Sequence, residues 1–525
     1  MIDLRNKKIL SVLMTAIWVI QLLVELIAFG IVWQLNMLPG KYMLIMAVVL
    51  GVLWLLTGGL LFLGKKKAGN GRRIVAMILA VLIVLGCAGA SGAVSQLSRT
   101  MNSVTGNKEI TTMMAVYVRV DDGAQQIQNA SGYTFAVLEN IGADKTAKAL
   151  DSLQNLLGVR VATVGYPSVM DLVYALYSGE VDAILMSSAY TGILEELDGY
   201  GDFGEKTRVL YEISLVDKVD TGSSGEKDPL TTRPQVGENK GDNESDKNTP
   251  VEVASITNTP FVVYLSGSDT RSTTLVTSRS DVNILAVVNP ETKQVLLVNT
   301  PRDYYIPHPY APEGQRDKLT HLGNDGIACS IAGLENLYNE RVDFYAQINF
   351  TGFETLIDAI GGITVYFERS FSAFGILPIY EGDNYLTGAQ ALMVARDRYS
   401  FSDGDNARGR NQMKIIKAVI QKLASGAIIS NYADILASLQ GMFVTDIGMN
   451  DISELVKMQL NDLASWNVQT YAVTGVNGED RTYTGGNASV MYVDQGMVDY
   501  ASELIDRVIA GDILTDQDAI YPGWR

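Results

Sequence analysis

The chain has 525 residues and a formal net charge of −17, with 47% hydrophobic residues. It contains only two histidines and two cysteines, so neither a multi-histidine metal site nor an extracellular disulfide framework is expected, and a Ser-His-Asp hydrolase is disfavoured. Such an acidic chain is also not expected to bind nucleic acid.

Three long apolar runs open the chain, at residues 9–33, 42–63 and 74–94. Each is long enough to cross a hydrocarbon core of about 30 Å. The first is too long for a signal peptide, and two more runs follow it. Residues 1–95 are therefore predicted to form three transmembrane helices. Glu25, within the first run, is expected to pack between helices or beside a polar cavity, the alternative being a functional intramembrane carboxylate.

Basic residues set the predicted orientation. Three precede the first run, five lie between Lys65 and Arg73, and the loop between the first two runs holds only Lys41. By the positive-inside rule, the N-terminus and the second loop are cytoplasmic. Everything after about Ser95 is then expected to lie outside the cell, as part of a multi-pass protein of the cell membrane.

Residues 96–216 are predicted to form a small α/β accessory domain. Strand-like segments alternate with helical ones, which favours parallel pairing. The segment 171–185 resembles one lobe of extracytoplasmic solute-binding proteins. Because such proteins clamp a ligand between two lobes, a helper or docking role is favoured over solute binding. The strands are expected at 113–120, 133–138, 159–164 and 181–186, and the helices at 144–157 and 170–177.

A second domain is predicted at 259–511, followed by a tail at 512–525. Residues 217–258 separate it from the accessory domain and are rich in Gly, Ser, Asn, Asp, Glu and Lys, a composition typical of a flexible linker. The second domain mixes the two kinds of element throughout, so an α/β fold is expected. Strands are predicted at 261–265, 282–288, 295–299 and 468–473, and helices at 327–338, 353–360, 412–423, 451–463 and 495–508.

Carboxylates and arginines recur together at the ends of the first three of these strands. They stand in Asp269-Thr-Arg271, Arg279-Ser-Asp281 and Pro301-Arg302-Asp303. One such pair is usually a surface salt bridge of small energetic value. Three pairs at three strand ends instead favour a phosphoryl site, because carboxylates bind hard divalent cations and arginines bind phosphate oxygens.

An arginine-rich stretch at residues 396–412 supports this interpretation. Arg396, Arg398, Arg408 and Arg410 fall within fifteen residues of an otherwise acidic chain. The alternative is a solvated helix face with intrahelical ion pairs, since aspartates are interleaved. Taken with the strand-end pairs, the stretch favours an anion-binding site.

From about residue 259 to 511, the sequence resembles the LytR-CpsA-Psr family. This similarity implies an α/β domain with a central mixed sheet flanked by helices, and the outward-facing membrane anchor agrees with it. The shared landmarks follow one another in the order Asp269-Thr-Arg271, Ser278-Arg-Ser-Asp281, Asn299-Thr-Pro-Arg-Asp303, Asp317-Lys-Leu-Thr-His321, Asn349-Phe-Thr-Gly-Phe353, Asp358-Ala-Ile-Gly-Gly362, Leu386-Thr-Gly-Ala-Gln-Ala-Leu392, Arg396-Asp-Arg398 and Gly404-Asp-Asn-Ala-Arg408.

The resemblance implies an extracytoplasmic phosphotransferase of cell wall biogenesis. Such an enzyme moves a glycopolymer, for example teichoic acid or capsule, from a polyprenyl-pyrophosphate carrier to peptidoglycan with the help of Mg²⁺. By position, Asp269 and Asp281 are the implied metal ligands. Asp281, Arg302 and Asp303 are the implied catalytic residues, with Arg302 or Asp303 assisting deprotonation of the acceptor hydroxyl. The implied pyrophosphate ligands are Arg271, Arg279, Arg302, Lys318, Arg396, Arg398, Arg408, Arg410 and Gln412.

The chain also departs from the family pattern. Asn411 stands where a second arginine is expected, with Arg410 one residue earlier. Three membrane helices replace the usual one, and the accessory domain is additional. Two other functions remain open at this point: a non-catalytic protein that binds lipid-linked phosphate, and a pyrophosphatase that recycles the lipid carrier.

The orientation is open to a direct test. A cysteine placed between residues 217 and 252 is expected to react with a membrane-impermeant thiol reagent on intact cells, because the basic residues hold the second loop inside. Labelling that begins only after lysis would show that the soluble domains lie in the cytoplasm.

Overall fold

The computed structural model describes residues 2–63, 71–105, 109–197, 199–218, 255–402, 404–425, 435 and 437–522. Most of the predicted linker at 217–258 therefore lies outside the described residues. The chain forms two compact units. The first comprises Met1–Thr105, Ala424–Gln440 and Ile447–Ala464, and the second Gly106–Leu423, Gly441–Asp446 and Ser465–Arg525.

The first unit contains three long helices, α1 (Ile2–Leu35), α2 (Gly40–Phe62) and α3 (Gly71–Val104). Each includes a segment long and apolar enough to cross a membrane, at Ser11–Leu35, Gly40–Phe62 and Gly71–Gln96. The three predicted membrane helices are thereby confirmed. The same unit includes α14 (Met449–Asp462).

Aromatic stacking and a polar network join α1 to α2. The Trp18 ring stacks on Trp54 with 4.2 Å between centroids, and its indole N–H donates to the Trp54 carbonyl oxygen at 3.0 Å. The Gln21 amide oxygen accepts from Thr57 Oγ1 at 2.9 Å, and its amide nitrogen donates to Glu25 at 2.8 Å. Glu25 is only 3% exposed, so it packs between helices as expected, with its polar partner on the same helix.

Within the second unit, the accessory domain is built on a five-stranded sheet of order β3-β2-β4-β1-β5. The predicted parallel pairing holds for β2 with β3 and with β4, whereas β1 is antiparallel to both β4 and β5. The long edge strand β5 was missed by the sequence prediction. The elements are β1 (Glu109–Arg119), β2 (Thr134–Leu138), α4 (Ala143–Leu157), β3 (Ala162–Tyr166), α5 (Val169–Ser178), β4 (Ala183–Ser187), α6 (Thr191–Leu194), α7 (Phe203–Lys206) and β5 (Thr207–Lys218).

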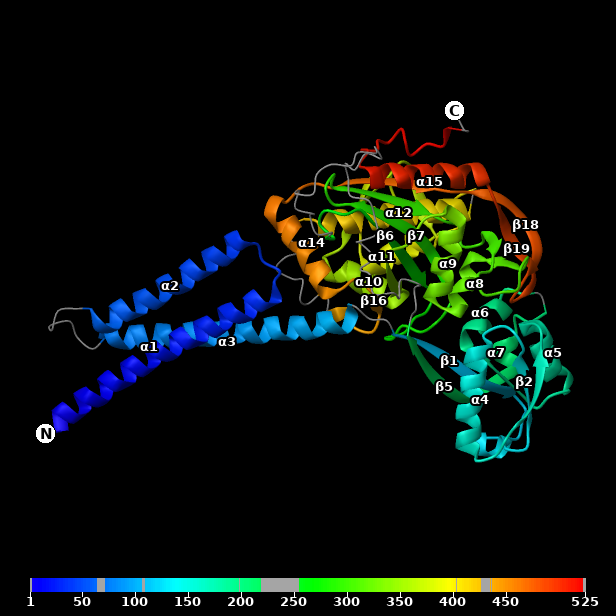
Figure 1. Cartoon of the computed structure of the whole chain (residues 1–525), viewed down its shortest axis with the longest axis horizontal. Helices are drawn as coiled ribbons and strands as arrows, with labels where there is room; N and C mark the ends of the chain where they lie inside the picture. The colour runs from blue at the N-terminus through cyan, green and yellow to red at the C-terminus, as the bar shows by residue number, and fades with distance from the viewer. Residues whose placement is uncertain are drawn as a thin grey trace, which may run out of the picture. The chain divides into compact units, whose positions relative to one another are not determined.

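The remainder of this unit has a six-stranded mixed sheet of order β16-β11-β6-β7-β8-β17. Its central strands β6 and β7 are labelled in Figure 1. Strands β6, β7 and β8 are antiparallel neighbours, while β11 lies parallel to β6 and β17 parallel to β8. The predicted α/β class with a mixed sheet is confirmed. The strands are β6 (Phe261–Ser268), β7 (Ser280–Asn289), β8 (Gln294–Asn299), β11 (Phe344–Asn349), β16 (Phe443–Thr445) and β17 (Asn467–Ala472).

Both faces of this sheet are covered. Leu285 and Val287 in β7 pack in one core with Leu334 of α9 (Ile327–Tyr338) and Leu504 of α15 (Gln495–Ala510). The alternate residue Ile284, which points to the other face, is fully buried as well. The other elements are β9 (Tyr305–Pro307), β10 (Arg316–Lys318), α8 (Leu319–Leu322), α10 (Phe350–Ala359), β12 (Ile363–Phe367), β13 (Phe371–Ala373), β14 (Leu377–Ile379), β15 (Gly382–Leu386), α11 (Gly388–Arg396), α12 (Asp405–Leu423), β18 (Gly475–Thr482) and β19 (Gly486–Val493).

A buried carboxylate, Asp317, joins β10 and α8 to the loop between β18 and β19. Its Oδ1 accepts from His321 Nδ1 at 2.6 Å and from the Lys318 amide at 2.7 Å. Its Oδ2 accepts from the Thr484 amide at 2.9 Å and from Thr484 Oγ1 at 2.6 Å. Burial raises the pKa of Asp317, but the His321 and Thr484 interactions outweigh it and the net pKa is lowered. The landmark 317–321 thus has a structural role.

Asp317→Asn is expected to lower the free energy of unfolding by about 2–4 kcal/mol, because it removes a buried charge that accepts four hydrogen bonds. The pKa of Asp317 is lower in the folded protein than in the unfolded chain. The stabilisation by its charge is therefore fully present when the pH is above the unfolded-state pKa, and it is lost as the pH falls through the folded-state pKa. Thermal unfolding of the detergent-solubilised chain measures it, with the exposed Glu313→Gln as control. Equal stability of the two variants would contradict the role of Asp317.

Candidate active site

The candidate site lies where the three antiparallel strands of the central sheet meet at one edge. Strand β6 ends at Ser268, β7 begins at Ser280 opposite it, and β8 ends at Asn299 opposite Ile284. The residues that follow or precede these ends are those that the sequence singled out. We call Asp269, Arg279, Asp281, Arg302, Asp303 and Lys318 the strand-end cluster.

Each of the two candidate metal ligands is held by a guanidinium group. Arg279 donates to Asp269 Oδ2 from Nη2 at 2.6 Å and from Nε at 3.2 Å. Arg302 donates from Nη1 to Asp281 Oδ1 at 2.9 Å, and Thr320 Oγ1 donates to the same oxygen at 3.3 Å. The Arg302 side chain is only 9% exposed, so this pair is nearly removed from water.

Asp303 and Lys318 complete the cluster. Lys318 Nζ lies 3.2 Å from Asp303 Oδ1, and Arg302 Nε lies 3.6 Å from Asp303 Oδ2. The Lys318 side chain is 4% exposed. Asp303 Oδ1 is buried and has an ion pair but no hydrogen bond from the residues that the structure describes. This oxygen is therefore available to accept a hydrogen bond from a bound group.

The pKa values of the two candidate metal ligands are shifted in opposite directions. Burial raises the pKa of Asp281, but the charges of Arg302, Arg408 and Arg279 outweigh it and hold the pKa at about 2. The pKa of Asp269 is raised, first by burial and then by the charge of Asp281. Burial lowers the pKa of Arg302, but neighbouring carboxylates outweigh it, so this guanidinium stays protonated.

Asp269 and Asp281 fit a hard divalent cation. Carboxylate oxygens are the ligands that Mg²⁺ prefers. After burial, the charge of Asp281 is the next cause that raises the pKa of Asp269, as expected for two carboxylates that repel each other. A cation between them would relieve this repulsion, and the arginine hydrogen bonds occupy only one oxygen of each carboxylate.

Glu196, which the sequence analysis missed, reaches into the strand-end cluster from the accessory domain. It follows α6, and its Oε1 accepts from Arg279 Nη1 at 2.7 Å and from Arg302 Nη2 at 3.4 Å. Its Oε2 accepts from Lys318 Nζ at 3.0 Å. Burial raises the pKa of Glu196, but the charges of Lys318, Arg302 and Arg279 outweigh it and lower the pKa to about 2. No motif around Glu196 indicates this contact.

The start of α12 adds Arg408 to the site. This helix begins at Asp405, seven residues before the predicted start at 412. Arg408 is 7% exposed, and its charge lowers the pKa of Asp281. A Cβ at Gly409 would lie 2.3 Å from Asn299 Nδ2, so the absence of a side chain at 409 lets α12 approach the end of β8 closely.

Two other residues of the arginine stretch, Gln412 and Arg396, make contacts outside the strand-end cluster. Gln412 is buried and donates to the Ala395 carbonyl oxygen at 3.1 Å, which ties α12 to α11. Arg396 is exposed and stacks over the Phe350 ring at 4.7 Å. Arg410 is exposed and Arg398, in the loop between α11 and α12, is half-buried.

Arg271 also lies beside α10. It pairs with Glu354 at 3.4 Å, and its side chain is 59% exposed. Both arginines thus contact side chains of α10. Arg396 contacts Phe350 at the start of the helix, and Arg271 contacts Glu354 one turn later. The amide of Phe350, the first residue of α10, donates to the Thr270 carbonyl oxygen at 3.2 Å, so this helix begins beside the loop that carries Asp269.

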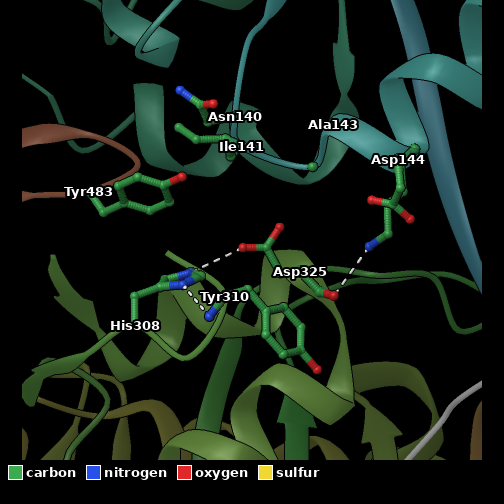
Figure 2. Close-up of a pocket in the computed structure, with 10 residues that line it drawn as sticks. Asn140, Ile141, Ala143, Asp144, His308, Tyr310, Asp325 and Tyr483 are labelled. Atoms are coloured by element: carbon green, nitrogen blue, oxygen red, sulfur yellow. Dashed lines mark hydrogen bonds and ion pairs between the residues drawn. The ribbon is translucent and has the colours of Figure 1, made fainter. Parts of the chain in front are cut away.

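A separate cavity of about 410 Å³ lies between the accessory domain and the central sheet domain (Figure 2). Residues 140–145 line it from one side, and His308, Tyr310, Asp325 and Tyr483 from the other. The Asp325 carboxylate contacts His308 Nε2 at 3.1 Å and accepts from Tyr190 at 3.0 Å. The cavity therefore has polar walls whose main carboxylate is already paired.

His308, Asp325 and Cys329 form a group whose possible metal-ligand atoms lie within 4.8 Å of one another. Burial raises the pKa of the Cys329 thiol, so the thiolate that a metal requires is disfavoured. With the Asp325 hydrogen bonds already made, this group serves to join the two domains.

A family model described as the LytR_cpsA_psr family matches residues 232–503, just over half of the chain. The chain belongs to this family. The matched region begins after the accessory domain and includes every residue of the strand-end cluster.

Two relatives carry the same name, polyisoprenyl-teichoic acid–peptidoglycan teichoic acid transferase TagU. The Enterococcus faecalis protein is 36% identical over 198 residues, which cover 37% of this chain and 64% of that protein. The Bacillus mycoides protein is 31% identical over 215 residues, covering 41% and 69%. The chain thus spans about two thirds of the length of these relatives, and slightly less for the first. The crystal structure of B. subtilis TagV aligns with a TM-score of 0.41 and 22% identity, covering 49% of this chain and 99% of that one.

Proposed function

We propose that this protein is a membrane-anchored phosphotransferase that moves a glycopolymer, of the teichoic acid class, from a polyprenyl-pyrophosphate carrier to peptidoglycan. The strand-end cluster carries the proposal. It gathers buried cations and carboxylates at one sheet edge, in the composition that phosphoryl transfer requires. The names of the relatives from E. faecalis and B. mycoides support the choice of polymer and acceptor.

Arg279, Arg302 and Lys318 are the proposed pyrophosphate ligands. Their N–H groups converge on one region, where Glu196 now accepts from all three. Charge-assisted hydrogen bonds of this kind hold phosphoryl oxygens and stabilise the charge that develops on the leaving group. Mg²⁺ held by Asp269 and Asp281 would supply additional neutralisation of the pyrophosphate charge.

Asp303 is the proposed proton acceptor for the attacking hydroxyl. Of the two residues that the sequence left open for this role, Arg302 is held protonated by its carboxylate neighbours. Asp303 Oδ1 is ion-paired with Lys318 and has no hydrogen bond from the described residues, and we assign it to orient an acceptor hydroxyl and take its proton.

The three apolar helices suit a lipid-linked donor. We place the N-terminus in the cytoplasm and both soluble domains outside, on the basic-residue pattern. The tether then keeps the site at high effective concentration near the outer leaflet, where the lipid carrier presents its pyrophosphate.

Arg302→Ala is expected to reduce transfer from a short polyprenyl-pyrophosphate glycan donor to a peptidoglycan acceptor by about 30- to 1000-fold, which corresponds to about 2–4 kcal/mol for a charge-assisted contact in a dehydrated site. Arg160→Ala, an exposed arginine of the accessory domain, is the control and should transfer normally. Normal turnover in Arg302→Ala would place the chemistry elsewhere. Phosphate release without an acceptor would favour a pyrophosphatase, and donor binding without turnover a binding protein.

Asp269→Asn and Asp281→Asn are expected to raise the Mg²⁺ concentration for half-maximal transfer by about tenfold or more, since each removes a charged oxygen ligand. The exposed Asp516→Asn should leave that concentration unchanged. Excess chelator should abolish transfer by the unmodified protein. Full activity in chelator would contradict the magnesium proposal.

A further inference from the structure

Glu196 accepts hydrogen bonds from the same cationic side chains that the proposed function assigns to binding the substrate. Its two carboxylate oxygens accept from Arg279, Arg302 and Lys318 at 2.7, 3.4 and 3.0 Å. A carboxylate and a phosphoryl group make the same kind of charge-assisted hydrogen bond to guanidinium and ammonium donors. Glu196 therefore stands where an anionic substrate group would have to bind.

Five of the six side-chain nitrogens of the two arginines already donate a hydrogen bond, and the sixth, Arg302 Nε, lies 3.6 Å from Asp303. On Arg279, Nε and Nη2 donate to Asp269, and Nη1 donates to Glu196 and to the Gly192 carbonyl oxygen. On Arg302, Nη1 donates to Asp281 and Nη2 to Glu196, while Nε faces Asp303. A phosphate can gain the donors that Glu196 now holds only by displacing this carboxylate, which comes from outside the cluster's own domain.

Contacts of the accessory domain hold Glu196 in this place. Gly192 packs against the Arg279 guanidinium so closely that a Cβ would lie 2.9 Å from Cζ. The Thr277 amide donates to the Thr111 carbonyl oxygen at 2.8 Å, and the Thr112 and Thr277 hydroxyls lie 2.9 Å apart. The position of Glu196 is therefore set by a docked domain, not by charge attraction alone.

Glu196 is also the carboxylate that can leave most easily. Its side chain is 31% exposed, against 21% for Asp269, 17% for Asp281 and 22% for Asp303. It belongs to the short segment after α6, whereas those three flank strands of the central sheet.

We infer that Glu196 is an internal competitor for the anion site: the docked accessory domain keeps the cluster closed, and a pyrophosphate-bearing substrate binds by displacing this carboxylate. The inference rests on the proposed function and adds its regulation. The apparent affinity for substrate is then lowered by the fraction of molecules that are closed.

Geranyl pyrophosphate with Mg²⁺ is a suitable probe, and calorimetry on the detergent-solubilised full chain measures its binding. Glu196→Gln keeps the size of the side chain and removes its charge. We expect it to bind the probe about tenfold more tightly than the unmodified protein, which corresponds to a closed population of about 90%. Glu196→Asp, which retains the charge on a shorter side chain, should fall between the two.

Glu195→Gln is the matched control, because it removes the same charge from the exposed neighbouring residue. It should bind as the unmodified protein does. Unchanged or weaker binding by a Glu196→Gln variant with a normal unfolding temperature would overturn the inference. Arg302→Ala separates the two proposals. If it loses probe binding while Glu196→Gln gains none, the pyrophosphate site stands and only the competitor role fails. If it binds normally, the site is wrong and both proposals fall.

Discussion

The structure depends on balancing charges that have been taken out of water at one edge of the central sheet. A buried ion costs several kcal/mol unless it is paired and hydrogen-bonded. Arg302 meets this requirement through Asp281, Asp303 and Glu196 at once. The ends of three antiparallel strands bring these partners together, so the site depends on the topology of the sheet. A parallel arrangement of β6, β7 and β8 would send Asp281 to the opposite edge.

Much of this arrangement was predictable because short segments of the sequence carry the pattern that indicates it. Strands β6, β7 and β8 alternate or run apolar over five to seven residues, and their ends are marked by charged residues. Positions next to strand ends in a hairpin-connected sheet share an edge, so Asp269, Asp281 and Arg302 were expected near one another. The three membrane helices were likewise evident from length and apolarity alone.

The contact made by Glu196 lay beyond such reasoning. It joins residues 83 to 122 positions apart in two different domains, and neither local pattern nor spacing encodes a domain-docking geometry. The strand β5 was missed for a related reason. It pairs with β1 across the whole accessory domain, from Thr207 opposite Arg119 to Lys218 opposite Glu109, and its register depends on that distant partner.

The arginines of the stretch differ in burial. Residues two apart on a helix point in nearly opposite directions, so Arg408 turns inward while Arg410 is exposed. Apolar periodicity placed the start of α12 at 412, because the polar first turns carry no such pattern. Asn411, which replaces the arginine expected from the family, is 4% exposed, and its Nδ2 has no hydrogen-bond partner in the described part of the chain.

The buried carboxylate Asp317 links the central sheet domain to the accessory domain through its two oxygens. One oxygen fixes the backbone of Lys318, which carries a cation of the site. The other fixes Thr484, whose neighbour Gly485 packs against Ile193 of the accessory domain so tightly that a Cβ would lie 2.6 Å away. Displacing the accessory domain therefore disturbs the hydrogen bonds of Asp317, the residue that also positions Lys318. On the proposed competition by Glu196, occupancy of the site and docking of the domain share a coupling free energy, and by linkage each alters the other to the same extent.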